Sequence, residues 1–348
     1  PRTNIEQLVA EIWSEHLGVE PISVYDDFFE LGGHSLLAVR VLNQIERETG
    51  KRLPLASLFE HTTVESMAMM LQMDAKSITW DSLVPIKPHG HKMPLYIVHG
   101  AGLNVLFFNT LAKNMDPEQP VYGLQAKGLN GIDEPLEKIE DMAAYYISEI
   151  VRQNPKGPYA LAGFSFGGII AFEMAKQFKA RGKEVKMLAM FDTYAYQSDR
   201  YDSSFRRLYN SARYFTKQLL FTFTLLKEDP KRTIEYKSEA IKRRFIQFYW
   251  KLKYGNKQNQ EGFFGYANNI DIKNYQAWEK YVFTPYNGSI ELFRAKKRTF
   301  YMDDFEYLGW KPFALKGINI HEIPGEHNFI FAPPNDKEFA AILQECLD

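Results

Sequence analysis

One serine stands in a pattern typical of a covalent nucleophile. Ser165 lies in Gly163-Phe-Ser-Phe-Gly167, between the apolar run 159–162 and a helical pattern. A tight strand-to-helix turn needs neighbours without side chains, and it lifts the serine hydroxyl clear of a sheet. It also places the backbone N–H of Phe166 at the start of the helix, where an oxyanion is favoured. The pattern predicts a nucleophile at Ser165 and an oxyanion donor at Phe166.

A serine hydroxyl needs a base, and the sequence offers one near its end. His327 follows the predicted last strand, 318–323, in the turn Pro324-Gly-Glu-His. Seven other histidines are scattered along the chain in places that fit this role less well. We therefore predict that His327 is the general base.

The acid of such a triad has three candidates. Asp192 directly follows a predicted strand, 185–191, whereas Asp303 and Asp304 lie several residues beyond the next one, 289–293. All three preserve the order Ser, Asp, His, which is that of α/β-hydrolases. We prefer Asp192 because it stands at the carboxyl end of a strand, where sites gather. Asp303 and Asp304 stay open as alternatives.

The second oxyanion donor is expected in the loop after the first strand of the sheet. That loop reads His99-Gly-Ala-Gly102 after the predicted strand 95–98, and the backbone N–H of Ala101 is our candidate. A tight turn without a donor role is the alternative.

These residues require a sheet that carries them at one edge. From residue 90 onward, short apolar strands alternate with helical stretches, which predicts a mostly parallel sheet covered on both faces. Residues 194–280 interrupt that rhythm with helical, aromatic and basic sequence, and we expect them to form a lid. Apolar residues at 241, 245, 248 and 252 keep helical spacing in this segment. A solvent-exposed helix face is the simpler explanation of the charged residues of this segment.

A second serine, Ser35, opens a helical pattern that runs to Thr49. Residues 1–75 are predicted to be all helical, with further helices over 5–17 and 64–71 and a short turn at Pro54. By local physics alone, Ser35 is a helix cap. We expect three parts: a helical domain over 1–75, a linker over 76–89 and the α/β domain over 90–348.

The composition excludes several classes of function. The net charge is -1, which gives no electrostatic reason to expect nucleic acid as a partner. A single cysteine, Cys346, cannot form an internal disulfide, and without zinc spacing we expect no metal and an incidental thiol. No apolar run suggests a membrane span. The start Pro1-Arg-Thr-Asn does not resemble a signal peptide, so we expect a cytoplasmic piece of a longer chain.

The first domain resembles a known family. The stretch Phe28-Phe-Glu-Leu-Gly-Gly-His-Ser-Leu-Leu37 is similar to the attachment motif of peptidyl carrier domains of nonribosomal peptide synthetases. The resemblance implies a 4′-phosphopantetheine on Ser35, added by a phosphopantetheinyl transferase, whose thiol holds a peptidyl or acyl thioester. The helix start suits a phosphodiester. Leu36, Val39 and Arg40 are expected to form an edge for partner domains.

Residues 90–348 resemble the type I thioesterase domains that end such synthetases. The resemblance rests on the two glycine motifs already described, on Phe191-Asp-Thr-Tyr194, on Leu308-Gly-Trp310 and on the His327 turn. It places the acid at Asp192, and it implies upstream condensation and adenylation domains as partners. The usual His-Pro after the first strand is His99-Gly100 here.

The combined prediction is a four-helix carrier followed by an α/β-hydrolase with a helical lid. It would pass an acyl group from Ser35 to Ser165 and release it by hydrolysis or macrocyclisation. The alternatives are a generic serine esterase with an unrelated helical appendage and a docking module with a dead hydrolase fold.

Overall fold

The computed structural model describes residues 1–74, 80–129, 132–195, 204–231, 233–234, 238 and 263–348. Within this part of the chain, no helix is both long enough and apolar enough to cross a membrane. The predicted amphipathic positions 241, 245, 248 and 252 lie outside the described residues.

The first domain consists of four helices, as predicted: α1 (Asn4–Leu17), α2 (Ser35–Thr49), α3 (Ser57–Glu60) and α4 (Val64–Gln72). Thr3 and Thr63 begin α1 and α4, because each side-chain oxygen accepts an N–H of the first turn. The apolar faces of the helices pack around the fully buried rings of Trp13 and Phe28. The short turn expected after Pro54 continues into α3.

The rest of the chain is built on a seven-stranded sheet. Its strands are β1 (Leu83–Lys87), β2 (Leu95–Val98), β3 (Val121–Leu124), β4 (Tyr159–Phe164), β5 (Val185–Phe191), β6 (Ile290–Lys297) and β7 (Ile318–Glu326). They lie in the order β1-β3-β2-β4-β5-β6-β7. All neighbours are parallel except β1, which runs antiparallel to β3. This confirms the predicted mostly parallel sheet.

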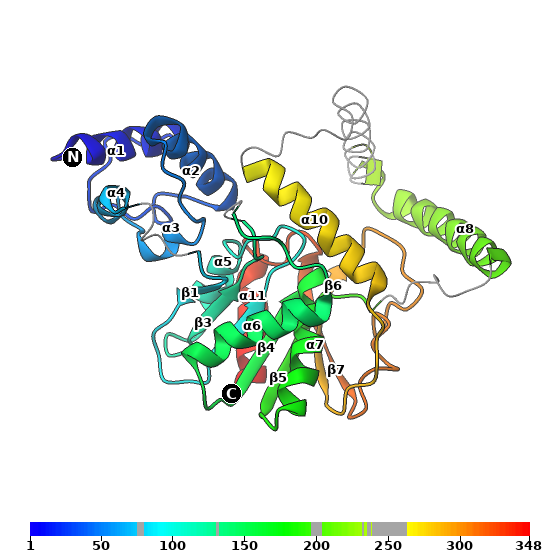
Figure 1. Cartoon of the computed structure of the whole chain (residues 1–348). Coiled ribbons are helices and arrows are strands. Elements are labelled where there is room, and N and C mark those ends of the chain that lie inside the picture. The colour runs from blue at the N-terminus through cyan, green and yellow to red at the C-terminus, as the bar shows by residue number, and fades with distance from the viewer. Residues whose placement is uncertain (75–79, 130–131, 196–203, 232, 235–237, 239–262) are drawn as a thin grey trace.

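Helices cover both faces of this sheet (Figure 1). One face packs against α6 (Ile139–Gln153) and α7 (Phe166–Ala180), and the other packs against α5 (Phe108–Asn114) and α11 (Asn335–Leu347). Successive strand residues alternate between the two cores: Leu161 points to the first and Ala160 and Ala162 to the second. Because both faces are buried, the central strands are apolar throughout.

Two strands were not predicted from the sequence. β1 lies inside the segment 76–89 that was expected to be only a linker, so the sheet begins before residue 90. Pro85 made this run resemble a linker, but an edge strand tolerates a proline. β3 contains Gly123, where a side chain would collide with Val105.

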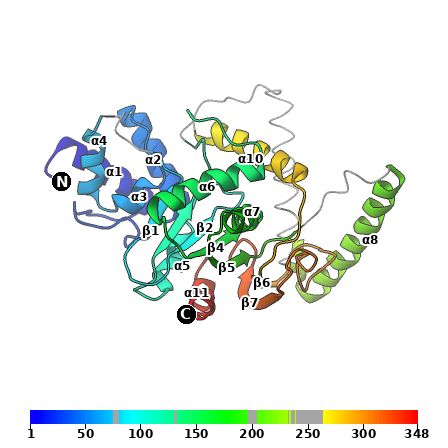
Figure 2. The ribbon, with the colours of Figure 1, turned by 60° about the horizontal axis from the view of Figure 1, so that its bottom comes forward.

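Among the residues that the structure describes between β5 and β6, within the predicted lid segment, the longer helices are α8 (Ser204–Glu228) and α10 (Phe263–Lys280). α10 lies above the sheet, and α8 lies on the side opposite the carrier domain in both views (Figures 1 and 2).

Candidate active site

Ser165 sits at the sharp turn between β4 and α7. Its backbone has φ 51° and ψ -118°, a left-handed conformation that is strained for a residue with a side chain. A Cβ at Gly163 would collide with the Gly167 backbone, and one at Gly167 would collide with the His99 carbonyl. The flanking glycines are therefore required by close backbone packing, as the G-x-S-x-G pattern predicted.

His327 follows β7 and faces the serine. Its Nε2 lies 3.1 Å from the Ser165 Oγ, and its Nδ1 lies 2.8 Å from the Asp192 Oδ2. The imidazole stacks on the ring of Phe164, with 4.9 Å between ring centroids, which fixes the plane of the base. The side chains of Ser165, Asp192 and His327, which are far apart in the sequence, thus meet at the carboxyl ends of β4, β5 and β7.

Asp192 is 2% exposed and accepts hydrogen bonds on both oxygens. The Oδ1 accepts from the backbone N–H of Ala295, at 2.9 Å, and from Nη1 of Arg298, at 2.8 Å. Burial by itself would raise the pKa of this carboxyl. The hydrogen bond to His327 and the charge of Arg298 outweigh burial, and the pKa is lowered. Asp192 is held as a carboxylate facing His327.

The two alternative acids are engaged elsewhere. Asp303 accepts from Lys217 on α8 and from the hydroxyl of Tyr301. Asp304 accepts from the backbone N–H groups of a loop, including that of Gly309 at 3.0 Å. Neither carboxylate is brought to His327, whereas Asp192 is.

Both candidate oxyanion donors lie beside the serine. Ala101 and Phe166 line the same cavity as Ser165. Phe166 is the first residue of α7, so no preceding helical turn can accept its N–H. The loop that carries Ala101 is supported by His99, which is 1% exposed and bonded to the Gly100 carbonyl and the Tyr146 hydroxyl. Burial lowers the pKa of His99 to about 4.

A cavity of about 300 Å³ opens at the three residues Ser165, Asp192 and His327. One wall is α10, which contributes Asp271, Asn274, Tyr275 and Trp278; the other walls include Ile169, Tyr194, Phe300 and Met302. The lining is largely aromatic and aliphatic, which suits the organic part of an acyl group. Burial raises the pKa of Asp271. The inserted helix α10 therefore covers the predicted nucleophile.

Ser35 is placed at the first residue of α2, with His34 in extended conformation as the residue before the helix. The turn into it uses Gly32, at φ +93°, and Gly33, where a Cβ would collide with Phe28. The free N–H groups of this helix start suit an attached phosphodiester. The backbone at Ser35 thus fits the predicted attachment of phosphopantetheine.

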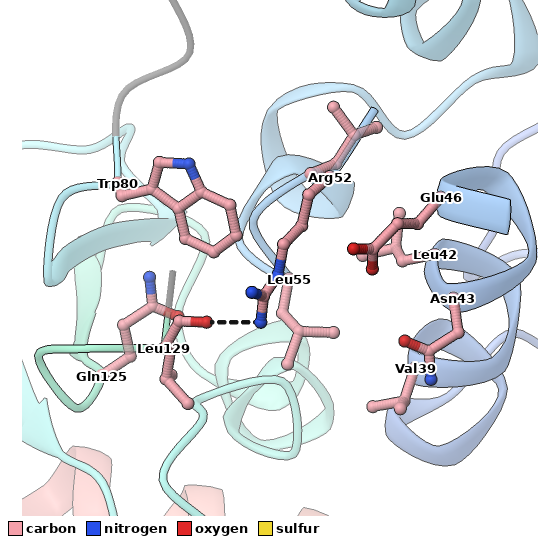
Figure 3. Close-up of a pocket in the computed structure, with 10 residues that line it drawn as sticks. Val39, Leu42, Asn43, Glu46, Arg52, Leu55, Trp80, Gln125 and Leu129 are labelled. Carbon is pink, nitrogen blue, oxygen red and sulfur yellow. Dashed lines mark hydrogen bonds between the residues drawn. The ribbon is translucent and has the colours of Figure 1, made fainter. Parts of the chain in front are cut away.

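The carrier packs directly on the α/β domain (Figure 3). Leu106, in the loop before α5, is 3% exposed and belongs to the apolar core of the carrier. Arg52 of the carrier donates to the Leu129 carbonyl at 3.1 Å and lies over the ring of Trp80. Val39, predicted to form part of a partner edge, lines the small hollow between the two domains, while Arg40 is exposed.

Cys346 lies beside His321, with Sγ 3.6 Å from Nε2, and the same nitrogen is 2.7 Å from a carboxylate oxygen of Glu291. Burial raises the pKa of this thiol to about 11. A protonated thiol is a weak nucleophile, so Cys346 is poorly suited to attack a substrate.

Sequence reasoning missed Arg298 and the Ala295 N–H. Arg298 is 106 residues from the aspartate it contacts, at the end of the basic run Lys296-Lys-Arg298, and it looks like a solvated charge in the sequence. Only the parallel pairing of β5 with β6 brings the two together.

The fold and this constellation define an α/β-hydrolase domain preceded by a helical carrier domain. Residues 93–346 match the family model of the thioesterase domain, and residues 7–71 match the model of the phosphopantetheine attachment site. The chain belongs to the thioesterase domain family, with a carrier domain in front of a thioesterase domain of the nonribosomal peptide synthetase type.

Curated relatives are consistent with this. The chain is 40% identical to a dimodular nonribosomal peptide synthase of Bacillus subtilis over 194 residues, 56% of this chain and 8% of the relative. It is 39% identical to the indigoidine synthase of Dickeya dadantii over 188 residues, 54% of this chain and 13% of the relative. It thus spans only a small part of these proteins.

Solved structures share the fold. A four-domain nonribosomal peptide synthetase, bound to AMP and glycine, matches 99% of this chain with a TM-score of 0.59 and 26% identity, over 26% of its own length. The NocB thioesterase domain, in a covalent complex with a fluorophosphonate nocardicin G analogue, matches 74% of this chain and 96% of its own, with a TM-score of 0.52 and 20% identity.

Proposed function

We propose that this chain releases an acyl or peptidyl group from its own carrier domain. The observation that carries the proposal is the bonded series Ser165, His327 and Asp192 at the floor of an apolar cavity under α10. In this proposal residues 1–75 are the carrier, 76–89 contain the connection and 90–348 are the thioesterase, with 194–280 as its lid.

Ser35 is the proposed attachment point of 4′-phosphopantetheine, which supplies a thiol that holds the acyl group as a thioester. The partners that follow from this assignment are a phosphopantetheinyl transferase that modifies Ser35 and upstream condensation and adenylation domains. The family relation supports these partners.

His327 starts the reaction by removing the proton of the Ser165 hydroxyl through Nε2. Asp192 holds Nδ1–H and stabilises the imidazolium that forms. The serine oxygen attacks the thioester carbonyl, and the backbone N–H groups of Ala101 and Phe166 stabilise the oxyanion. The C–S bond then breaks, the imidazolium gives its proton to the leaving thiolate, and the acyl group is left as an ester on Ser165.

The same base completes release. His327 takes a proton from water or from an amine or hydroxyl of the acyl chain, which attacks the ester, and returns a proton to Ser165. Water gives hydrolysis, and an internal nucleophile gives macrocyclisation. Access of water beneath α10 decides between them.

The decisive experiment follows an acyl group by intact-protein mass spectrometry. A phosphopantetheinyl transferase loads Ser35 with a short acyl-phosphopantetheine from the corresponding acyl-coenzyme A, which releases 3′,5′-ADP, and the loss of the acyl group is timed. We expect Ser165→Ala to retain the acyl mass on Ser35, with release reduced by at least about 1,000-fold. Release at the unchanged rate would overturn the proposal.

The same experiment tests the alternatives. No gain in mass on Ser35 with the transferase would favour a generic esterase with an unrelated appendage. Failure of a fluorophosphonate probe to label Ser165 would favour a catalytically dead docking module.

A further inference from the structure

The strongest feature that the proposed function does not use is the ion pair behind the triad. Nη1 of Arg298 lies 2.8 Å from Oδ1 of Asp192, and the two side chains are 13% and 1% exposed. Because both side chains are shielded from water, the attraction between their charges is poorly screened. Its strength depends on the geometry of the hydrogen bond that joins them. In the ion pair of Arg152 with Glu149, by contrast, the arginine is open to solvent, at 66% exposed.

The hydrogen bonds that Asp192 accepts also fix the orientation of its carboxylate. Asp192 receives Ala295 N–H and Arg298 on one oxygen, which leaves the other oxygen for Nδ1 of His327. Two donors on Oδ1 fix the rotation of the carboxylate, so that Oδ2 must face the imidazole. Arg298 comes directly after β6, which pairs with β5, the strand that ends at Asp192. The sheet therefore holds both partners.

We infer that Arg298 is a positioning residue that fixes the triad aspartate and tunes the protonation of His327 through it. This inference rests on the proposed function, since it concerns how the same three residues work.

The electrostatic consequence has a definite sign. The positive charge of Arg298 lies on the far oxygen of the carboxylate, where it partly neutralises the negative charge that Asp192 presents to the imidazole. Loss of the charge would make the imidazolium more stable, so a higher pH would be needed to free the base. The acid limb of the pH–rate profile would then move to higher pH.

Other charged groups surround the site and must be held constant in the comparison. Asp271 of α10 lines the substrate cavity, and the groups around the guanidinium line a second cavity of about 410 Å³. The second set comes from the end of β6, the end of β7 and the end of α8: Lys296, Lys297, Glu326, Glu228 and Asp229. None of them contacts Asp192 in the described part of the chain, whereas Arg298 does.

Two substitutions at Arg298 separate the effect of its charge from the effect of its shape. Arg298→Met removes the charge and keeps much of the side-chain length. Arg298→Lys keeps the charge but loses the planar guanidinium group with its several N–H donors. The control is Arg152→Met on α6, an arginine that also pairs with a buried carboxylate, that of Glu149, and that does not line the substrate cavity.

The measurement is kcat/KM for a small thioester substrate from pH 5 to 9 in the full chain. We expect Arg298→Met to lower kcat/KM roughly 10- to 100-fold, the size of effect found when a group that orients a metal-ligating side chain is removed, and to shift the acid limb up by about one pH unit. Arg298→Lys should keep the acid limb within about 0.3 unit of wild type, because the charge is retained. Arg152→Met should match wild type in both.

The outcomes are distinguishable. An unmoved acid limb in folded Arg298→Met, checked by circular dichroism and by fluorophosphonate labelling of Ser165, would overturn this inference and leave the proposed function intact. If Ser165→Ala remains active in the same assay, the proposed function itself fails. If Arg298→Met does not fold, the acid limb of Arg298→Lys decides: a shift equal to about one unit would contradict the role of the charge.

Discussion

At the scale of single residues, the buried polar side chains near Ser165 show most about the chemistry of the site. His99 is the clearest case, because its neutral form is fixed by two bonds of opposite kind. Nδ1–H donates to the Gly100 carbonyl, and Nε2 accepts from the Tyr146 hydroxyl. The side chain is buried, and burial lowers its pKa to about 4. It thus supports the loop that carries Ala101 as an uncharged group.

This makes stability depend on pH in one direction. In the unfolded chain His99 takes up a proton near pH 6.5, whereas in the fold it does so only near pH 4. The unfolded state binds more protons between these values, so this contribution is complete above pH 6.5 and is lost as the pH falls toward 4. We expect a loss of at most about 3 kcal/mol in the wild type across that window.

The test is the free energy of unfolding in urea from pH 4 to 7. In His99→Gln, which has no titratable group, the stability should fall less over the same window than in the wild type. Equal slopes in the two proteins would contradict the assignment of a neutral His99.

At the scale of elements, α10 is the piece of the insertion that matters for the site. It forms one wall of the cavity, and its end is anchored by Tyr281, directly after the helix. The Tyr281 hydroxyl donates to Glu173 of α7 at 2.7 Å, with both residues buried. The helix that covers the serine is therefore bonded to the helix that begins beside it.

Removal of this single bond gives a test of α10 as a lid. We expect Tyr281→Phe to lower the free energy of unfolding by about 1–2 kcal/mol, because the buried Glu173 loses a partner. KM should rise as the cavity wall loosens, while the triad geometry and kcat stay near wild type. Denaturation and steady-state kinetics measure both effects, with the exposed Tyr25→Phe as the control. A change in kcat alone would contradict a lid role.

At the scale of the whole molecule, the carrier and the thioesterase domain are held together by a contact. Arg52 reaches from the carrier to the Leu129 carbonyl and to Trp80, and Leu106 of the second domain is buried in the carrier core (Figure 3). The contact lies along the loops that follow β2 and β3, so it is close in the chain to the loop that carries Ala101.

The prediction at this scale concerns transfer rather than chemistry. Arg52→Ala should slow unloading of the chain's own Ser35 roughly fivefold, the effect of one lost hydrogen bond of about 1 kcal/mol. Hydrolysis of a small free thioester should not change, because the cavity is untouched. The exposed Arg47→Ala on α2 is the control. Equal slowing with the free thioester would show that Arg52 acts through the site.

The sequence by itself determined the local features. Close backbone packing permits only glycine at 163 and 167, and helical periodicity gave three of the carrier helices, so both serines could be placed from short stretches of sequence. The order of strands and helices likewise predicted the sheet. The triad roles of Ser165, His327 and Asp192 stay a proposal, although their meeting was expected.

The tertiary structure decided what depends on pairing between distant segments. It selected Asp192 over Asp303 and Asp304 as the partner of His327, because β5 ends beside β7 only through the pairing of both with β6. It converted part of a supposed linker into β1, and it brought Arg298 to the aspartate. Such contacts leave no local pattern, because hydrogen bonds across a sheet depend on strand order and register rather than on neighbours in the chain.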